Sequence, residues 1–360
     1  MKPFEHGGNV YDAGVFSQAW LDFSANINPL GLSDTVKKSI LDNMENLVHY
    51  PDPTGAKLKQ VISVNYGLNV DNIILGNGAV ELMYVYSHCY RPERVLIPVP
   101  SFSEYERGAR AAGCQVEYLY LDKSAGFPLN KKQLMERLPE VDAVVLGNPN
   151  NPTGTLMTKA DVMAVVEAAH GFGTDVLVDE SFLDFLPEPY KYSVMDQVTA
   201  YPNLIVISSM TKFYAIPGLR LGFGVAGSDR IEQLDMGKDP WNVNLLAQMA
   251  GVAALQDEAY KKATRQRLTE CIKNLYKDLG ALPELTVYKP SVNFILVGLQ
   301  RSGLTAAEFT AKMRKRGILV RDCSNYPGMD EYHVRFAVRL EKDNERLLTA
   351  VKAVLQEDRG

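Results

Sequence analysis

One lysine lies inside a mostly apolar stretch, SSMTKFYAIPGLRLGF, which spans residues 208–223. Burying an ammonium group is unfavourable unless the charge is paired, neutralised or used in chemistry. Lys212 is therefore a candidate reactive amine, and Arg220 in the same stretch is a candidate partner for an anion. The alternative is that Lys212 extends to the surface from an ordinary strand and loop.

A glycine-rich turn, GNGAVE, follows the apolar run NIILG and precedes a predicted helix that begins near Ala79. The N–H groups of Gly78 and Ala79 suit a phosphate group, because the N–H groups at a helix start are unpaired and the helix dipole is positive there. The turn matches neither the full dinucleotide-binding pattern nor the Walker pattern. A purely structural turn is the alternative reading.

Two further polar residues follow apolar runs. NPNNPTG, residues 148–154, predicts a tight turn that directs the Asn151 amide beyond the end of a strand, with a cis peptide bond before Pro152. Asp179 ends the run DVLVD, where a carboxylate needs a cation or a helix start nearby. Asp179 is therefore either a helix cap or the counter-ion of a protonated ring nitrogen.

Short runs rich in Val, Ile and Leu alternate along the chain with segments of helical periodicity. This alternation predicts an α/β fold with a mainly parallel sheet covered by helices on both faces. In such sheets ligands bind beyond the C-terminal ends of the strands, which is where the polar residues fall. The predicted strands are residues 72–76, 94–100, 115–121, 142–149, 175–181 and 204–210, and one predicted helix spans 159–173.

The pattern changes near residue 256, where a long charged helix leads to the strand candidates TVYKP, NFILVGL, ILVRDC and YHVRFAVRL. These elements predict a smaller α+β domain. We therefore expect three parts: an N-terminal segment, 1–45, that packs on the small domain and the active site; a large domain, 46–255; and a small domain, 256–360.

The composition argues against several classes of function. The chain has 360 residues and a net charge of −5, so no general basic field attracts nucleic acid or anionic lipid. No apolar run approaches the length of a membrane span, and we expect no signal peptide. The scattered histidines and cysteines show no metal-binding spacing, so we expect no metal site. We expect reduced thiols at Cys89, Cys114, Cys271 and Cys323, and therefore a cytoplasmic location for the protein.

The turn, the amide, the carboxylate and the lysine lie in order at successive predicted strand ends. In this order and spacing the chain resembles fold-type I pyridoxal-phosphate enzymes over nearly its whole length. The resemblance implies that Lys212 binds the cofactor aldehyde and that Asp179 keeps the pyridine nitrogen protonated, so that the ring acts as an electron sink. The other cofactor contacts it implies are Gly78, Ala79, Ser209, Thr211 and Arg220 for the phosphate, Asn151 for the ring oxygen, and Phe102 for the ring face.

Two aromatic residues refine this resemblance. Tyr50, in HYPDPTG, resembles the tyrosine that reaches the cofactor phosphate of a neighbouring subunit, which implies a homodimer with shared active sites. Aminotransferases of this group commonly carry a tyrosine three residues after the aspartate, whereas DESF places Phe182 there. A phenylalanine cannot donate to the ring oxygen, so this difference weakens the expectation of simple amino-group transfer.

The segments HGGNVYDAG, DFSANINPLG, PWNVN, SNYPG and NERLL resemble the L-threonine-O-3-phosphate decarboxylases of cobalamin biosynthesis. The resemblance implies decarboxylation of L-threonine O-3-phosphate, with L-serine O-phosphate as a second substrate. A first alternative is an aminotransferase such as one acting on histidinol phosphate, which shares the cofactor motifs. A second alternative is a cofactor-binding sensor without turnover, which the presence of Lys212 disfavours.

A phosphoamino acid needs two anion sites besides the one for the cofactor phosphate. Arg335 and Arg339 in VRFAVR share one strand face, so spacing does not choose between them, and surface ion pairs are the default for both. By resemblance Arg335 binds the substrate carboxylate next to Asn151. We expect Arg321, His6 and Asn26 to bind the substrate phosphate, since guanidinium geometry suits that group.

Overall fold

The computed structural model describes residues 6–12, 15–16 and 20–357. Its main feature is a seven-stranded sheet with the order β4-β10-β9-β8-β7-β5-β6. The strands from β9 to β6 run parallel, and β10 is antiparallel to both β4 and β9. The strands are β4 (Ile73–Gly76), β5 (Arg94–Val99), β6 (Gln115–Tyr120), β7 (Ala143–Gly147), β8 (Asp175–Asp179), β9 (Leu204–Ser209) and β10 (Gly222–Val225).

This sheet confirms the predicted mainly parallel α/β fold, and the six predicted strands correspond to β4 through β9. The sequence analysis did not include β10, because GFGV is short and half glycine and therefore lacks the Val, Ile and Leu signal. Glycine is needed there at Gly222, where a Cβ atom would lie 2.4 Å from the Ala79 backbone nitrogen. The missed strand therefore brings the glycine-rich turn close to the sheet.

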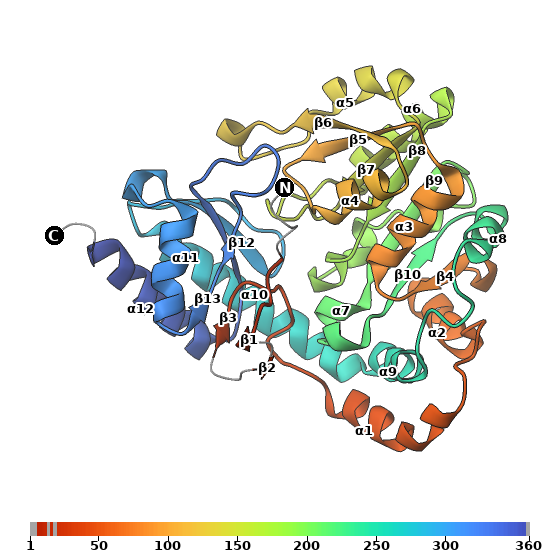
Figure 1. Cartoon of the computed structure of the whole chain (residues 1–360), viewed down its shortest axis with the longest axis horizontal. Helices are drawn as coiled ribbons and strands as arrows, with labels where there is room; N and C mark the ends of the chain where they lie inside the picture. The colour runs from red at the N-terminus through yellow and green to blue at the C-terminus, as the bar shows by residue number, and fades with distance from the viewer. Residues whose placement is uncertain (1–5, 13–14, 17–19, 358–360) are drawn as a thin grey trace.

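Helices cover both faces of the large sheet (Figure 1). Alternate residues of each strand enter different cores: Ile74 packs with one set of helices, whereas Ile73 and Leu75 pack with the other. One face carries α3 (Ala79–Tyr90), α4 (Glu104–Ala111) and α8 (Ser228–Met236). The other carries α2 (Ala56–Tyr66) and α6 (Lys159–Phe172), with α5 (Lys131–Arg137) and α9 (Leu245–Gln256) packed against them.

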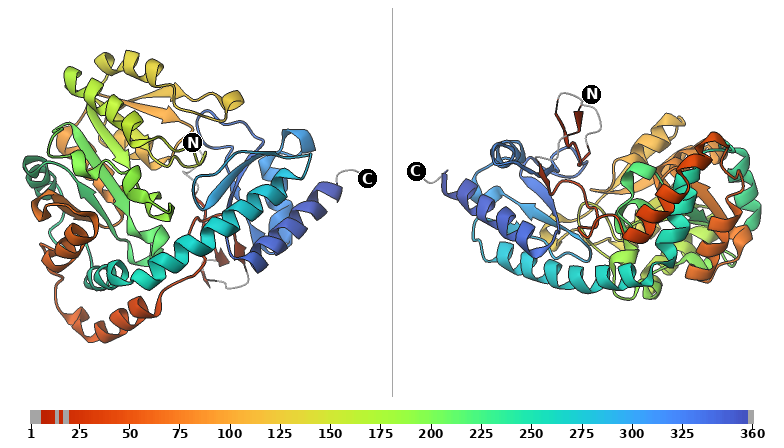
Figure 2. Two further views of the ribbon diagram at one scale, coloured as in Figure 1. Left: turned by 180° about the vertical axis from the view of Figure 1, so that it is seen from behind. Right: turned by 90° about the horizontal axis from the view of Figure 1, so that it is seen from below.

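A smaller antiparallel sheet has the order β11-β12-β15-β14. The long helix α10 (Glu258–Gly280) runs from the large sheet to this smaller one (Figure 2). Helix α12 (Glu341–Glu357) packs against α10, and α11 (Ala306–Lys315) packs against α12. The strands are β11 (Thr286–Val287), β12 (Phe294–Gly298), β14 (Arg321–Asp322) and β15 (His333–Ala337).

The beginning of the described chain lies against this smaller sheet. After the short hairpin of β1 (Tyr11–Asp12) and β2 (Val15–Phe16), strand β3 (Leu21–Asp22) pairs in parallel with β13 (Ile318–Leu319). Helix α1 (Asp34–Asp42) then packs on α9 of the large part. The three-part division at residues 45 and 255 stays a prediction. The N-terminal segment pairs with β13, which forms a separate two-stranded sheet with β3 and directly precedes β14 of the smaller sheet.

One predicted element differs from the structure. The pattern of ILVRDC predicts a single strand, whereas the structure divides it into β13, which pairs with β3, and β14, which pairs with β15. The two halves have different partners, and local sequence does not encode that choice. Within the residues that the structure describes, no helix combines the length and apolar character needed to cross a membrane.

Candidate active site

Lys212 lies in α7 (Met210–Phe213), a single helical turn that directly follows β9. Lys212 Nζ donates a hydrogen bond to Ser209 Oγ at 3.0 Å, and the Thr211 hydroxyl lies 2.7 Å from the same oxygen. On the other side, the Asn28 N–H donates to the Lys212 carbonyl oxygen at 3.0 Å. The lysine is therefore fixed between the end of a central strand and the N-terminal segment.

The Lys212 amine has an environment that favours its neutral form. Burial lowers the pKa of Lys212 from 10.5 to about 8; the charge of Asp179 opposes this lowering, and that of Arg220 adds to it. The Phe182 ring, with its centroid 6.0 Å from Nζ, supplies part of the apolar wall. An amine whose pKa is lowered to about 8 is suited to form a covalent bond with an aldehyde carbon.

The glycine-rich turn and Arg220 form a cradle at the start of α3. Gly78 has a φ of 82°, and a Cβ atom there would lie 2.5 Å from Arg220 Nη2, so only glycine lets the guanidinium approach. The Gly78 N–H donates to the Gly76 carbonyl at 2.8 Å. Ala79 is the first helical residue, and its N–H has no acceptor within the helix. The cradle therefore offers the Ala79 N–H, a guanidinium and the nearby Ser209 and Thr211 hydroxyls, a donor set that suits a phosphate.

Asp179 ends β8 and is buried, with 7% of its surface exposed. Its Oδ2 accepts a hydrogen bond from the Tyr105 hydroxyl at 2.8 Å, and its Oδ1 accepts from the Ser181 N–H at 2.9 Å. Both contacts fix the orientation of the carboxyl group. The sequence analysis did not identify Tyr105, although it lies one helical turn after Phe102 in PSFSEY.

Asn151 joins the two parts of the protein at this point. Its Oδ1 accepts a hydrogen bond from Arg335 Nη1, and the guanidinium also donates through Nη2 to the Ser24 carbonyl at 2.8 Å. The Asn151–Pro152 peptide bond is cis, as the sequence analysis expected. Asn151 Nδ2 makes no hydrogen bond within residues 6–12, 15–16 and 20–357, so it remains as a donor.

These residues surround one hollow, lined among others by Ala79, Phe102, Asn151, Asp179 and Lys212. It contains an amine, an anchored carboxylate and an amide donor beside the cradle. This set fits pyridoxal phosphate: the cradle would hold the phosphate, Asp179 would pair with the ring nitrogen, Asn151 would donate to the ring oxygen and Phe102 would cover the ring.

A second pocket, of about 350 Å³, lies between the N-terminal segment, β14 and α11. His6 and Arg321 both line it, so the structure brings these two predicted substrate ligands together. Asn26 is not among its lining residues; it is buried, and its Oδ1 has no hydrogen-bond partner. Arg321 Nη2 donates to Asn325 Oδ1 at 2.8 Å.

Tyr50 lies apart from this group. It is 77% exposed and stacks on Trp241, with ring centroids 4.7 Å apart. Within this chain it does not line the hollow that contains Lys212.

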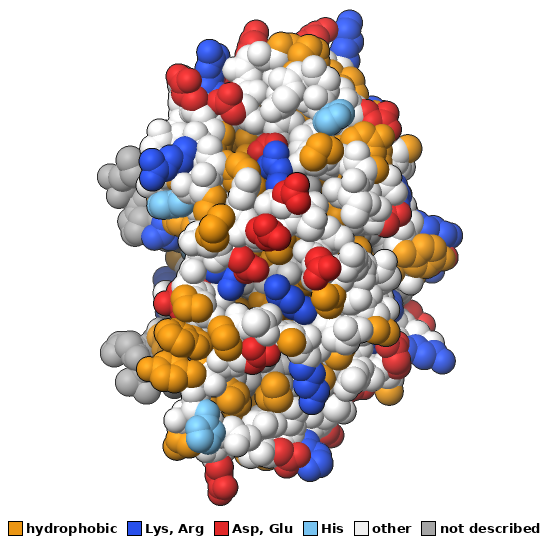
Figure 3. Space-filling model, turned by 90° about the vertical axis from the view of Figure 1, so that its right-hand side faces the viewer, with side chains coloured by type: hydrophobic (Ala, Val, Ile, Leu, Met, Phe, Trp, Pro, Cys, Tyr) orange, Lys and Arg blue, Asp and Glu red, His pale blue; other side chains and the backbone are white. Residues whose placement is uncertain are grey.

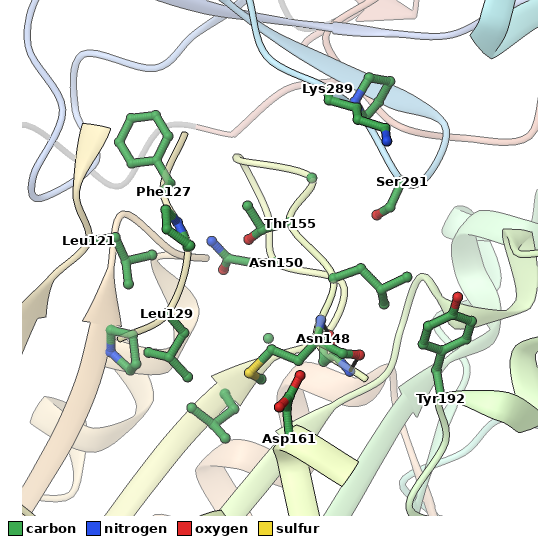
Figure 4. Close-up of a pocket in the computed structure, with 18 of the residues that line it drawn as sticks. Leu121, Phe127, Leu129, Asn148, Asn150, Thr155, Asp161, Tyr192, Lys289 and Ser291 are labelled. Carbon is green, nitrogen blue, oxygen red and sulfur yellow. Dashed lines mark hydrogen bonds between the residues drawn. The ribbon is translucent and has the colours of Figure 1, made fainter. Parts of the chain in front are cut away.

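A larger pocket of about 610 Å³ lies on the other side of the NPNNPTG turn (Figure 4). Asn148, Asn150 and Thr155 face it from the turn, and Lys289 and Ser291 face it from the segment that precedes β12. Neither Lys212 nor Asp179 lines this pocket. The reacting groups therefore belong to the smaller hollow.

A family model for class I and II aminotransferases matches residues 18–352. The chain belongs to this family. Members of the class I and II aminotransferase family use pyridoxal phosphate, and this protein is a pyridoxal-phosphate-dependent enzyme of fold-type I. The resemblance drawn from the sequence is confirmed.

Two curated relatives are each 36% identical to this chain. The putative threonine-phosphate decarboxylase of Caldanaerobacter subterraneus subsp. tengcongensis matches over 99% of this chain and 95% of its own length. The threonine-phosphate decarboxylase of Salmonella typhimurium matches over 97% and 96%, respectively. Among solved structures, the histidinol-phosphate aminotransferase from Clostridium acetobutylicum superposes with a TM-score of 0.87 and 32% identity, covering 93% of this chain and 99% of its own.

Proposed function

We propose that this enzyme decarboxylates L-threonine O-3-phosphate to (R)-1-amino-2-propanol O-2-phosphate and CO2 in cobalamin biosynthesis. One observation carries the proposal: Arg321 and Arg335 are direct cross-strand neighbours in β14 and β15, and each is 5% exposed. Within the described residues neither forms an ion pair with a carboxylate. Two buried, unneutralised guanidinium groups call for two anions, and a phosphoamino acid supplies a carboxylate and a phosphate. Arg335 contacts Asn151, which lines the Lys212 hollow, and Arg321 lines the pocket next to His6.

The carboxylate is assigned to Arg335 because this arginine touches the NPNNPTG turn. Its Nη1 and Nη2 are held by Asn151 and by the Ser24 carbonyl, while its Nε is buried without a partner. A guanidinium fixed at two points holds a bound carboxylate in one orientation relative to the hollow. We propose that this orientation favours loss of CO2 over loss of the Cα proton, because the way a substrate is positioned decides which of its bonds reacts.

When bound, the cofactor supplies an electron sink for the pair of electrons left on Cα after the bond to the carboxylate carbon breaks. The chain supplies the proton that completes the reaction. Lys212 Nζ, with a pKa of about 8, is a suitable acid to form the new Cα–H bond. Phe182 lies where aminotransferases of this group commonly carry a tyrosine that donates to the ring oxygen. The phenylalanine keeps the wall beside Lys212 Nζ apolar.

We assign the substrate phosphate to Arg321 together with His6, because both line the same pocket. Asn26 remains a proposed third ligand through its buried amide. L-Serine O-phosphate, which is one methyl group smaller, is a second proposed substrate, since one methyl group contributes little to discrimination. The cytoplasmic location also stays a prediction, based on the cysteine usage.

The proposal includes a homodimer in which Tyr50 reaches the cofactor phosphate of the other subunit. Its support is a run of exposed apolar side chains on α1 and the segment after it: Leu41, Met44, Leu47, Val48 and Tyr50, each at least 47% exposed, with Trp241 beside Tyr50. Figure 3 shows hydrophobic side chains gathered toward one edge of the molecule, while acidic and basic side chains are mixed across the middle. Exposed apolar groups of this kind are typical of an interface.

An aminotransferase acting on a phosphorylated amine is the second candidate, because the similarity to the histidinol-phosphate aminotransferase structure extends over 93% of this chain. The two reactions differ in their need for an amino-group acceptor. A lyase releases CO2 without an acceptor, whereas a transferase needs a 2-oxo acid.

The test incubates holoenzyme with L-threonine O-3-phosphate, L-serine O-phosphate or histidinol phosphate, each with and without 2-oxoglutarate, and measures CO2 and products. CO2 release without acceptor is expected; keto-product formation only with acceptor would overturn the proposal. Arg335→Met and Arg321→Met should each lower kcat/KM by about thirty-fold or more, as expected for a buried charge pair. Arg339→Met is the control, since Arg339 pairs instead with Asp343 at 2.9 Å.

A further inference from the structure

The HGG segment contains a histidine that contacts a helix far away in the sequence. His6 Nε2 lies 2.8 Å from Glu104 Oε1, and the His6 ring centroid lies 5.8 Å from that of Phe102. The Glu104 side chain is only 7% exposed, and it is also approached by Arg107 Nη1 at 3.5 Å and by the Tyr84 hydroxyl at 3.4 Å. A buried carboxylate in the first turn of α4 therefore holds one end of the segment.

The two glycines hold the other end against Ser24. A Cβ atom on Gly7 would lie 2.0 Å from the Ser24 carbonyl oxygen, so any side chain there would separate the two backbones. Gly8 has a φ of 85°, and its N–H donates to Ser24 Oγ at 2.7 Å. Ser24 is itself fixed, because its N–H and hydroxyl both donate to Asp22 Oδ1.

The same Ser24 carbonyl accepts the hydrogen bond from Arg335 Nη2 at 2.8 Å. A continuous path of contacts therefore leads from Glu104 on α4 through the HGG segment and Ser24 to Arg335 on β15 of the smaller sheet. This explains why glycine occupies positions 7 and 8, which the roles assigned above leave unexplained.

We propose that Glu104 is a positioning residue that seats the HGG segment, residues 6–8, as a strap between α4 and Arg335. The strap orients Arg335 through the Ser24 carbonyl and places His6 at the substrate-phosphate pocket. The effect on substrate binding rests on the proposed function; the seating of the strap does not.

The ionised form of Glu104 suits this role. Burial by itself raises the pKa of the carboxyl group, but the contacts from His6 and Arg107 outweigh burial, and the pKa lies below its usual 4.5. The carboxylate is therefore charged throughout the neutral range. A hydrogen bond to a charged group is stronger than one between neutral groups.

The test compares Glu104→Gln with Glu106→Gln in the holoenzyme. Glutamine keeps the shape of Glu104 and removes its charge. Glu106 is the matched control, because it lies on the same helix but pairs with Arg110 at 2.6 Å. Hydrogen–deuterium exchange of the amides of residues 6–9 should become about ten-fold faster in Glu104→Gln, the lower end of what a hydrogen bond to a charged group contributes.

Steady-state kinetics supply a second readout. KM for L-threonine O-3-phosphate should rise about ten-fold, and kcat should change less, because saturating substrate itself holds Arg335 in place. The visible absorbance of the bound cofactor should stay unchanged, since Glu104 does not line the Lys212 hollow. Exchange at residues 6–9 that matches Glu106→Gln would overturn the proposal, whatever the kinetics show.

Two further variants keep the result decisive. His6→Ala removes the partner side chain and should speed exchange in the same residues, even if Glu104→Gln folds poorly. The double variant should exchange no faster than the faster single variant, because both changes break one contact. If the wild-type enzyme releases no CO2 from any phosphoamino acid, the proposed function fails while the exchange result still tests the strap.

Discussion

Replacing Lys212 by methionine is expected to raise the free energy of unfolding of the cofactor-free protein at neutral pH. Without bound cofactor the ammonium form of Lys212 is poorly solvated, because burial disfavours its charge. Its pKa falls from 10.5 to about 8. This lowering corresponds to about 3 kcal/mol of unfavourable free energy for the charged form at pH 7.

Methionine keeps the length and apolar character of the side chain. It loses the hydrogen bond from Nζ to Ser209 Oγ, which offsets the gain by about 1 kcal/mol. The net expectation is an apoprotein that is more stable by about 2 kcal/mol at pH 7. The unfolded chain binds the proton more tightly than the folded chain, so the advantage is complete below pH 8, shrinks as pH rises from 8 to 10.5, and is absent above that range.

The assay is urea unfolding of both apoproteins at pH 7, 9 and 10.5, with the difference in unfolding free energy taken at each pH. Lys159→Met is the control, because Lys159 forms a surface ion pair with Asp196 at 2.6 Å and should show no such gain. The reasoning is refuted if Lys212→Met is less stable than wild type at pH 7. It is also refuted if the difference does not change between pH 7 and 10.5.

Two other changes probe the same site. Gly78→Ala should weaken cofactor binding by about ten-fold or more, because a Cβ at φ 82° is strained and meets the Arg220 guanidinium; spectrophotometric titration of apoprotein with pyridoxal phosphate measures this. Burial raises the pKa of Glu180 from 4.5 to about 8, so the folded chain keeps a proton that the unfolded chain loses, and stability falls as pH rises through that range. Glu180→Gln should remove a slope of up to about 1.4 kcal/mol per pH unit, and an unchanged slope in urea unfolding would contradict the assignment.

Much of the large sheet could be predicted from the sequence, because each strand is a short Val, Ile and Leu run bounded by turn residues. Asn151, Asp179 and Lys212 could be placed at strand ends for the same reason. The glycine-rich strand β10 and the division of ILVRDC between β13 and β14 could not, since both depend on which strand lies alongside. Those partners are distant in the sequence and leave no local pattern.

The roles of the two arginines in VRFAVR show the same limit. Their spacing places both on one strand face, and the sequence analysis left the choice to resemblance. In the structure Arg335 is buried and bonded to Asn151, whereas Arg339 leaves the end of β15 and pairs with Asp343. Only packing decides that Arg335 is buried without a carboxylate partner in the described residues, whereas Arg339 pairs with a nearby carboxylate.

The sequence by itself therefore indicated the cofactor, through a resemblance carried by local motifs: a glycine-rich turn, an amide, a carboxylate and an amine that follow or end β4, β7, β8 and β9. Only the tertiary structure decided how these groups are held. Tyr105 on Asp179, Arg335 on Asn151 and Glu104 on His6 join residues 74, 184 and 98 positions apart. Contacts of that separation form when the sheets and the N-terminal segment pack together, and no helical or strand period in the sequence records them.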